Sequence, residues 1–339
     1  MTLREFIHFC IERLAPLYPE AEAKAIAFRL LEHFTYIPSY KYISEPDLVI
    51  PDKDSNRHAG LAPASGAPHC SPALLCAALD ELETGRPLQY VLGFTEFCCH
   101  RFKVGEGCLI PRPETEELVS RIIDDLYDDT SGPSESLVER QVLSGRDQSR
   151  PEKVLPRDGK GREDDSLDDP FSILDLCTGS GCIAWSLAAE FPEAMVYGCD
   201  LSDAALRYAC RQRVKVRGAK PIFFSADVLA APPAGLPQFD LIVSNPPYIC
   251  DSERAAMRPN VLDFEPAEAL FVPDDDPLKF YRAIARWADA LLRPDGHLYR
   301  NQRALRLCRR RPLPRRPHPP GPLRPRPLRH PVTFRQREP

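Results

Sequence analysis

The sequence predicts an α/β fold preceded by a small all-α domain. Apolar residues in the first third of the chain recur at helical spacing, which indicates packed amphipathic helices. From residue 171 onward, short apolar runs alternate with helical stretches, and a glycine-rich turn follows the first of these runs. Such alternation is typical of a parallel sheet covered by helices. With 339 residues, the chain is long enough for two domains.

The first helix is expected to begin directly after Thr2. Thr2 and Glu5 have the spacing of a capping box, in which each side chain accepts a hydrogen bond from the backbone N–H of the other residue. The apolar residues that follow share one helical face: Leu3, Phe6, Ile7, Cys10, Ile11 and Leu14. This face is expected to lie in the core of a helical bundle.

Two further helices are expected in the same domain. One spans Ala21 to His33, and the other starts at Ser71, with Pro72 in its first turn, and ends at Gly85. Their apolar stripes are Leu30, Leu31 and Phe34 in the former and Leu74, Leu75, Ala78, Leu79 and Leu82 in the latter. We interpret these stripes as bundle core rather than as a binding groove.

The first strand of the α/β part, residues 171–176, runs into a glycine-rich turn that precedes a helical stretch at 183–189. The turn comprises Cys177, Thr178, Gly179, Ser180 and Gly181. Because glycine lets a backbone approach a ligand closely, a strand, such a turn and a helix form a nucleotide-binding element. This turn is not the dinucleotide fingerprint, which needs a third glycine at the position where this chain has Ala184. Asp175 would serve a pyrophosphate poorly, but it suits a cationic sulfonium with an amino-acid tail.

Two more expected strands lead to acidic residues. Residues 195–199 precede Asp200, about 20 residues past the glycines, where a carboxylate can accept hydrogen bonds from both hydroxyls of a ribose. Residues 221–224 lead to Asp227, which is placed to accept from an adenine amino group. Either acid alone is more often a cap at a strand end. Together with Asp175 and the glycine turn, the two acids predict a site for S-adenosylmethionine.

A fourth strand, residues 239–243, leads into Asn245, Pro246, Pro247 and Tyr248. Open α/β sheets bind ligands at the carboxyl ends of their strands. The two prolines fix two φ angles and remove two N–H donors. An amide oxygen, a fixed carbonyl and an aromatic face then form a cradle for a planar –NH2 group. Holding both hydrogens directs the nitrogen lone pair at an electrophile, so these four residues are the predicted catalytic group. A proline-rich loop without chemistry is the simpler alternative.

The motifs resemble those of a known family. Residues 175–184 (DLCTGSGCIA) and 244–249 (SNPPYI) are similar to the protein-(glutamine-N5) methyltransferases that modify peptide chain release factors, the HemK/PrmC family. Residues 85–93 (GRPLQYVLG) and 109–116 (LIPRPETE) match the segment between the two domains of that family, and other enzymes with Asn-Pro-Pro-Tyr do not share this pair. The resemblance covers roughly residues 1–128 and 171–299.

The resemblance implies a domain order and a reaction. Residues 1–85 would form a helical domain that helps to hold the release factor, residues 86–110 a β-hairpin connector, and residues 111–299 a Rossmann-like S-adenosylmethionine-dependent methyltransferase domain. The methyl group would pass to the side-chain nitrogen of the Gln in the Gly-Gly-Gln motif of the release factor. These expectations concern whole segments, whereas the roles of single residues follow from the motif positions.

By position in the motifs, the turn from Cys177 to Gly181 would line the methionine moiety, and Asp200 would hold the ribose. Asn245 would touch both cofactor and substrate, and the Asn-Pro-Pro-Tyr residues together would bind the glutamine. The position after Asp227 is often aromatic in this family and packs on adenine. Here it is Val228, so that contact is expected to be weakened or made otherwise.

The composition predicts a cytoplasmic enzyme without a membrane span or a metal. No run approaches the ~20 apolar residues of a membrane span. The N-terminus has no basic region followed by an apolar core, so no secretory signal is expected. The twelve cysteines contain no Cys-x-x-Cys or His/Cys ligand spacing, which favours reduced thiols over disulfides or a metal site.

Two segments depart from this pattern. Residues 129–170 are rich in Ser, Asp, Glu, Arg and Pro with almost no aromatic residue, which predicts a disordered insertion. Residues 300–339 hold 13 Arg, 10 Pro and one acidic residue, a net charge of +12. Because the whole chain carries −5, residues 1–299 carry −17. A basic tail is typical of nucleic-acid binding.

We interpret the tail instead as a frameshift product. After Tyr299 the family continues its strand with Leu-Glu-Ile, whereas this chain has Arg300 and Asn301. One permitted codon string for residues 300–310, read from its second base, spells Glu-Ile-Asn-Glu-Arg-Phe-Gly-Cys-Ala-Val. The tail is therefore expected to lie outside the sheet and to leave the last strands missing. A genuine Arg/Pro-rich tail is the alternative.

Two other functions compete with the first. Asn-Pro-Pro-Tyr also suits enzymes that methylate adenine N6 in DNA or guanine N2 in RNA, but such enzymes flip the base and need a basic groove or a recognition domain. The acidic charge of residues 1–299 favours a protein substrate and no stable nucleic-acid partner. The second alternative is an inactive truncated homologue that only binds.

Overall fold

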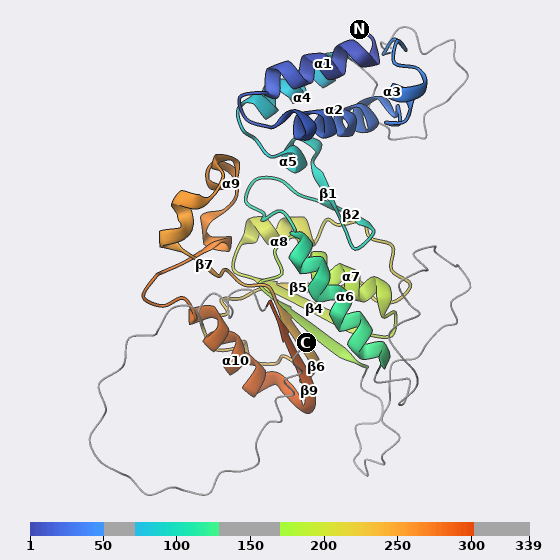
Figure 1. Cartoon of the computed structure of the whole chain (residues 1–339). Coiled ribbons are helices and arrows are strands. Elements are labelled where there is room, and N and C mark those ends of the chain that lie inside the picture. The colour runs from blue at the N-terminus through green and yellow to red at the C-terminus, as the bar shows by residue number, and fades with distance from the viewer. Residues whose placement is uncertain (51–71, 129–169, 302–339) are drawn as a thin grey trace, which may run out of the picture.

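The computed structural model describes residues 1–50, 72–128 and 170–301 of the chain. The amino-terminal helices α1 (Leu3–Leu14), α2 (Glu20–Thr35) and α4 (Pro72–Glu83) gather at one end of the molecule, with the short α3 (Lys41–Ser44) beside them (Figure 1). They share one hydrophobic core, to which each contributes its apolar stripe. The expected bundle packing of these stripes is therefore confirmed, although α2 begins one residue earlier and ends two residues later than predicted.

The start of α1 has the predicted cap. The Thr2 N–H donates to Glu5 Oε2 at 2.8 Å, and the Glu5 N–H donates to Thr2 Oγ1 at 3.2 Å. The stripe assigned to α4 needs one correction, because the Leu74 side chain is 39% exposed. Consecutive residues of a helix are rotated by about 100° around its axis. Leu74 therefore lies at the edge of the apolar stripe, whereas Leu75 and Leu79 lie in its buried part.

A hairpin lies between the bundle and the sheet (Figure 1). Helix α5 (Leu88–Leu92) precedes strands β1 (Phe94–Phe97) and β2 (His100–Lys103), which pair antiparallel. The two residues of the hairpin turn, Cys98 and Cys99, have φ values of 45° and 60°. Such left-handed pairs match the twist of the flanking strands, which is why two-residue hairpins adopt them.

The central sheet has five parallel strands in the order β5-β4-β3-β6-β9. Their bounds are β3 (Ser172–Leu176), β4 (Met195–Asp200), β5 (Ile222–Ser225), β6 (Phe239–Ser244) and β9 (Leu292–Arg300). The chain runs outward from β3 in one direction and then returns to β6 on the other side. The switch point of this doubly wound sheet therefore lies between β3 and β6, which is where open α/β sheets bind ligands. The predicted fold class is confirmed.

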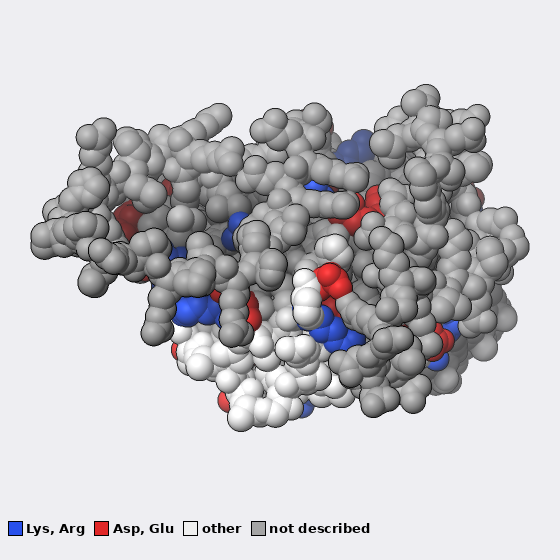
Figure 2. All heavy atoms as spheres, turned by 90° about the horizontal axis from the view of Figure 1, so that it is seen from below, with Lys and Arg blue, Asp and Glu red and all other residues white. Residues whose placement is uncertain are grey.

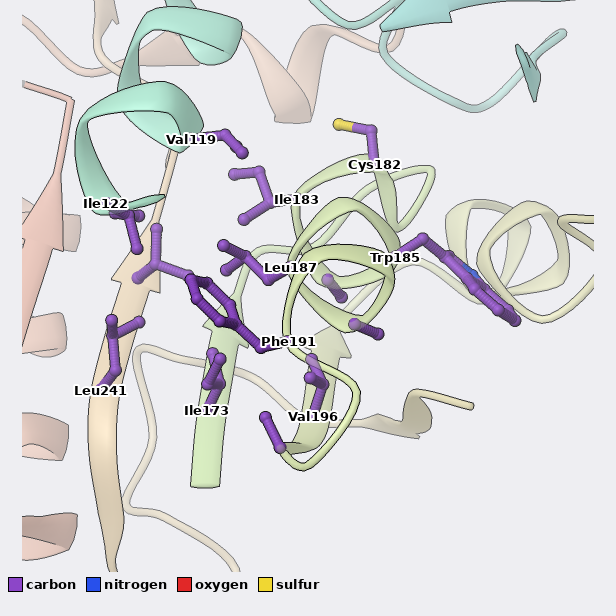
Figure 3. Close-up of a cluster of buried hydrophobic side chains, with 14 of the residues drawn as sticks. Val119, Ile122, Ile173, Cys182, Ile183, Trp185, Leu187, Phe191, Val196 and Leu241 are labelled. Carbon is purple, nitrogen blue, oxygen red and sulfur yellow. The ribbon is translucent and has the colours of Figure 1, made fainter. Parts of the chain in front are cut away.

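Helices cover both faces of the sheet. Helices α6 (Pro113–Asp128) and α7 (Cys182–Glu190) pack on one face, where Val119, Ile122, Ile183 and Leu187 converge on strand residues such as Ile173 (Figure 3). On the other face, α10 (Lys279–Leu291) buries its apolar side against alternate residues of the same strands. Both faces of the central strands are buried, as parallel sheets require. Helix α8 (Asp203–Ala209) connects β4 to β5.

The segment after β6 forms a small substructure of short elements. Strand β7 (Ile249–Cys250) pairs in parallel with β8 (Phe271–Val272). Between them lie η3 (Asp251–Ala256), α9 (Pro259–Phe264) and η4 (Ala267–Ala269). This substructure follows directly on the predicted Asn-Pro-Pro-Tyr motif, so it borders the carboxyl end of the sheet.

The end of the sheet corrects the expectation that residues 300–339 lie outside it. Arg300 is the last residue of β9 and pairs with Ser244 of β6. Asn301 is 8% exposed, and its carbonyl accepts a hydrogen bond from the Tyr281 hydroxyl at 3.2 Å. Backbone pairing does not depend on side-chain type, so a sequence that leaves the family pattern can still continue the strand. The predicted insertion, apart from Pro170, and residues 302–339 lie outside the described residues.

Two structural features are absent from the described residues. No helix among them is long and apolar enough to cross a membrane. Within the same ranges, no group of three or more His, Cys, Asp or Glu side chains could hold a metal ion. The cysteines that the structure describes are all free thiols.

Candidate active site

The turn between β3 and α7 has a backbone that leaves room for a ligand. Cys177, Gly179 and Gly181 have φ values of 59°, 57° and 77°, all in the left-handed region. A Cβ atom added to Gly179 would meet nothing within 4 Å, so the space beside this backbone is open. Cys177 and Gly179 are also the turn residues that keep accessible surface, whereas the Thr178 and Ser180 side chains are buried. A ligand would therefore meet the turn at Cys177 and Gly179.

Asp175 lies beneath the turn and has no exposed surface. Its Oδ2 accepts a hydrogen bond from Thr178 Oγ1 at 2.5 Å, and its Oδ1 makes no well-aligned hydrogen bond with the described residues. Burial raises the pKa of Asp175 to about 7, against the opposing effects of the Thr178 hydroxyl and the Ala184 N–H. In this structure Asp175 holds the turn through Thr178. Its direct contact with a cofactor stays a prediction.

Asp200 joins the end of β4 to the same turn. Its Oδ2 accepts from the Gly179 N–H at 2.8 Å, and its Oδ1 accepts from the Ser202 N–H at 2.9 Å. Burial raises the pKa of this carboxyl, although both N–H groups act in the opposite direction. Each carboxylate oxygen keeps a further lone pair. Asp200 can therefore accept hydroxyl hydrogens while it holds the turn in place.

The third predicted acid is arranged differently. Asp227 is half-buried, and its Oδ1 accepts from the Leu229 N–H at 2.8 Å, which closes a local turn. The Val228 side chain is buried in the core cluster that contains Ile284 and Trp287 of α10. The Val228 side chain therefore packs in the core of the sheet, and its contact with adenine stays a prediction.

Asn245 stands where β6 ends, beside the end of β3. The two strand ends are tied together because Ser244 Oγ donates to the Leu176 carbonyl at 2.7 Å. Pro246 and Pro247 are buried, and Tyr248 is half-buried. The structure thus places the predicted catalytic residues next to the glycine turn, at the switch point of the sheet.

The side-chain amide of Asn245 is held at both ends. Its Nδ2 donates to Thr115 Oγ1 at 3.1 Å, and its Oδ1 accepts from Asn301 Nδ2 at 3.1 Å. Thr115 and Asn301 were not among the predicted site residues. Thr115 lies within the 109–116 segment whose sequence resembles the family, but neither its type nor its spacing indicates a contact with a residue 130 positions away.

Two further residues brace the site without having been predicted. Gln212 Nε2 donates to the Ser180 carbonyl at 3.1 Å and to the Lys103 carbonyl at 3.0 Å, so it ties the hairpin to the glycine turn. Glu265, whose side chain is 1% exposed, accepts from the Ile110 N–H at 3.0 Å and from Arg112 at 2.5 Å. Because no periodicity marks a single polar residue in a loop, the sequence offers no signal for either.

Known proteins similar to this chain are methyltransferases. The family described as Methyltransferase small domain matches residues 165–261. The release factor glutamine methyltransferase of Bacteroides thetaiotaomicron is 39% identical over 230 residues, which are 68% of this chain and 68% of that protein. The enzyme of the same name from Flavobacterium psychrophilum is 32% identical over 299 residues, 88% of this chain and 86% of that protein.

Among solved structures, TrmN from Thermus thermophilus is 27% identical and covers 42% of this chain and 36% of its own, with a TM-score of 0.29. The two curated relatives carry the assignment, because both exceed 30% identity and this chain covers at least two thirds of each. The α/β fold with its parallel sheet agrees with it. The chain belongs to the release factor glutamine methyltransferase family.

Proposed function

We propose that this chain transfers the methyl group of S-adenosylmethionine to the side-chain N5 of the Gln in the Gly-Gly-Gln motif of peptide chain release factors. The observation that carries the proposal is the Asn245 side chain, fixed at the carboxyl end of β6 beside the open face of the glycine turn. The relatives' name supports the substrate class.

The described residues fit the cofactor. The open space beside Gly179 accommodates a ligand against the backbone, and the Asp200 oxygens have lone pairs for ribose hydroxyls. Burial raises the pKa of the Cys177 thiol well above its usual value, so this residue presents a neutral surface to the site. When bound, S-adenosylmethionine supplies an electrophilic methyl group. Cys177, Gly179 and Asp200 would hold it, with Asp227 near the adenine end.

The remaining chemistry belongs to the chain's own residues. An amide nitrogen is a poor nucleophile because its lone pair is delocalised. Asn245 Oδ1 accepts a hydrogen of the glutamine amide and thereby sets the direction of the nitrogen lone pair. Pro246 and Pro247 make the adjoining backbone rigid, and Tyr248 offers an aromatic face to the planar amide. In the reaction the glutamine nitrogen gains the methyl group and loses one hydrogen as a proton.

We also propose a role for each part of the chain and place the protein in the cytoplasm. Residues 1–85 would help to hold the release factor, residues 86–110 would connect the domains, and residues 111–299 would catalyse the transfer. No stable nucleic-acid partner is proposed. On the described part of the face in Figure 2, Lys and Arg lie beside Asp and Glu.

The test is methyl transfer from labelled S-adenosylmethionine to purified release factor. A matched release factor in which the Gln of the motif is replaced serves as the control. Label should appear in the intact factor and be absent from the control, while duplex DNA and RNA stay unlabelled under the same conditions. Comparable labelling of nucleic acid would favour the amino-methyltransferase alternative.

A further inference from the structure

The orientation of the Asn245 amide decides what the site presents to its substrate. The oxygen end can only accept hydrogen bonds and the nitrogen end can only donate them. A substrate –NH2 group needs an acceptor, so a reversed Asn245 would present the wrong end. The NH2 end of Asn301 can only donate, so it selects the oxygen end of Asn245, and the Thr115 hydroxyl, which can accept or donate, accepts from Nδ2 at the other end.

We propose that Thr115 is a positioning residue for methyl transfer, which acts by keeping Asn245 Oδ1 available as the acceptor for the substrate amide. This inference rests on the proposed function. Thr115 Oγ1 accepts from one hydrogen of Asn245 Nδ2, and the Thr115 side chain is buried, so water does not compete for this bond. The hydroxyl acts through Asn245 and does not itself touch the reacting atoms.

Thr115 is held firmly enough to serve in this way. It lies in the first turn of α6, and its N–H donates to the Arg112 carbonyl at 2.9 Å. Arg112 in turn pairs with the buried carboxylate of Glu265. Glu265 comes from the segment after the Asn-Pro-Pro-Tyr motif, so this pair ties the start of α6 to the segment that follows Asn245. A site on such supports is more precise than one on a free loop.

Asn301 supports the orientation from the other side. Its Nδ2 donates to Asn245 Oδ1, and its backbone is fixed by the Tyr281 hydroxyl and by a 3.4 Å bond from its N–H to the Ser244 carbonyl. With Asn301 oriented as it is, a reversed Asn245 would bring two NH2 donors together. Asn301 is nevertheless the second residue of the Arg/Pro-rich tail, and the shifted reading frame would replace it with Ile. Of the two contacts, only the one with Thr115 would be present both in the given chain and in the frame-corrected chain.

Thr115→Val tests the proposal, because valine keeps the shape and removes the hydroxyl, and Thr115→Ser is its matched rescue. With release factor as substrate, Thr115→Val should lower kcat about tenfold, while the affinity for S-adenosylmethionine and the melting temperature stay near wild type. Thr115→Ser should recover most of the rate. Equal kcat in wild type and Thr115→Val would overturn the proposal, as would a loss that serine does not restore.

A double-mutant cycle tests whether Thr115 acts through Asn245 or elsewhere in the site. If Thr115 acts through Asn245, Thr115→Val should have no further effect on kcat in an Asn245→Ala background. A full tenfold loss in that background would overturn the role. The side-chain amide signal of Asn245, identified by its loss in Asn245→Asp, provides a second readout by NMR without turnover. The chemical shift of this signal should change in Thr115→Val and stay near the wild-type value in Thr115→Ser. An unchanged chemical shift in Thr115→Val would contradict the contact.

The two proposals fail separately. Wild-type protein that labels no release factor would refute the proposed function, whereas the NMR result would still decide the Thr115 contact. Equal rates of release-factor labelling by wild type and Thr115→Val would refute the positioning role and leave the proposed function intact.

Discussion

The Asp200 carboxylate accepts a hydrogen bond from the Gly179 N–H at 2.8 Å, which joins the end of β4 to the glycine turn across 21 residues of sequence. One side chain thus shapes the turn and keeps lone pairs for a ligand. This double role leads to the first prediction.

Asp200→Ala should lower the affinity for S-adenosylmethionine at least about tenfold. The change removes charge-assisted hydrogen bonds worth ~1.5–3 kcal/mol each and leaves the Gly179 N–H without its partner. Asp200→Asn, which keeps one acceptor oxygen, should lose less. Calorimetric titration of the folded variants measures the effect, and an unchanged affinity in Asp200→Ala would reject the assignment.

Asn245→Ala should lower kcat by about 10²–10³, the range for one pre-organised polar contact, with a smaller change in cofactor affinity. Asn245→Asp keeps acceptor oxygens but loses the donor to Thr115, so partial activity is expected. Single-turnover methyl transfer at saturating cofactor separates the chemical step from binding. Equal rates in wild type and Asn245→Ala would exclude a catalytic role.

Asp175 should make stability depend on pH in an unusual direction. Its pKa is raised by burial from 3.8 to about 7, so the folded state binds the proton more tightly than the unfolded chain does. The stabilisation is fully present below pH 3.8 and is lost as the pH rises through about 7, at up to about 1.4 kcal/mol per pH unit. Asp175→Asn stays neutral and lacks this loss.

Urea denaturation of wild type and Asp175→Asn at pH 5 and pH 7 measures the effect. The variant should gain stability relative to wild type between the two pH values, because Asp175 of the unfolded wild type has lost its proton whereas the buried carboxyl of the folded state still binds it. Parallel changes in the two proteins would show that Asp175 does not titrate in this window.

Glu265→Ala should destabilise the protein by about 2 kcal/mol, because it leaves the Ile110 N–H and the Arg112 guanidinium without their buried partner. The partial exposure of Arg112 keeps the effect below that of a fully buried pair. Glu265→Gln retains an acceptor for the N–H and should lose about half as much. Thermal unfolding should show a lower Tm by about 4–8 °C, and an unchanged Tm would mean that the pair contributes nothing.

The coding DNA around codon 300 tests the frameshift interpretation. A shifted frame should continue the strand after Tyr299 with Glu-Ile, and the corrected protein should melt several degrees higher, as ~1 kcal/mol or more of added stability implies. Coding DNA without a second open frame, or a corrected protein of unchanged Tm, would establish the Arg/Pro-rich tail as genuine.

The local features of this fold were predictable, because they depend on neighbours in sequence. Residue patterns located α1, α2, α4 and α7 and the strands β3, β4, β5 and β6, and the capping box at Thr2 and the turn at Gly179 follow from residues a few positions apart. The strand order, which sets the switch point, comes from the structure.

Contacts between distant segments were not predictable in the same way. The bond between Thr115 and Asn245 and the brace by Gln212 depend on how α6 and the hairpin pack on the sheet, which no local pattern encodes. Asn301 was missed for another reason. The Arg/Pro-rich composition of residues 300–339 predicted that they lie outside the fold. Backbone pairing, which does not depend on the side chains, nevertheless extends β9 to Arg300.

The central claim is tested most directly by locating the methyl group. Release factor incubated with this protein and S-adenosylmethionine should gain one methyl group, which tandem mass spectrometry places on the Gln of Gly-Gly-Gln, and Asn245→Ala should reduce its formation at least a hundredfold. A methyl group on another residue, or none on the release factor while DNA or RNA is methylated, would contradict the account.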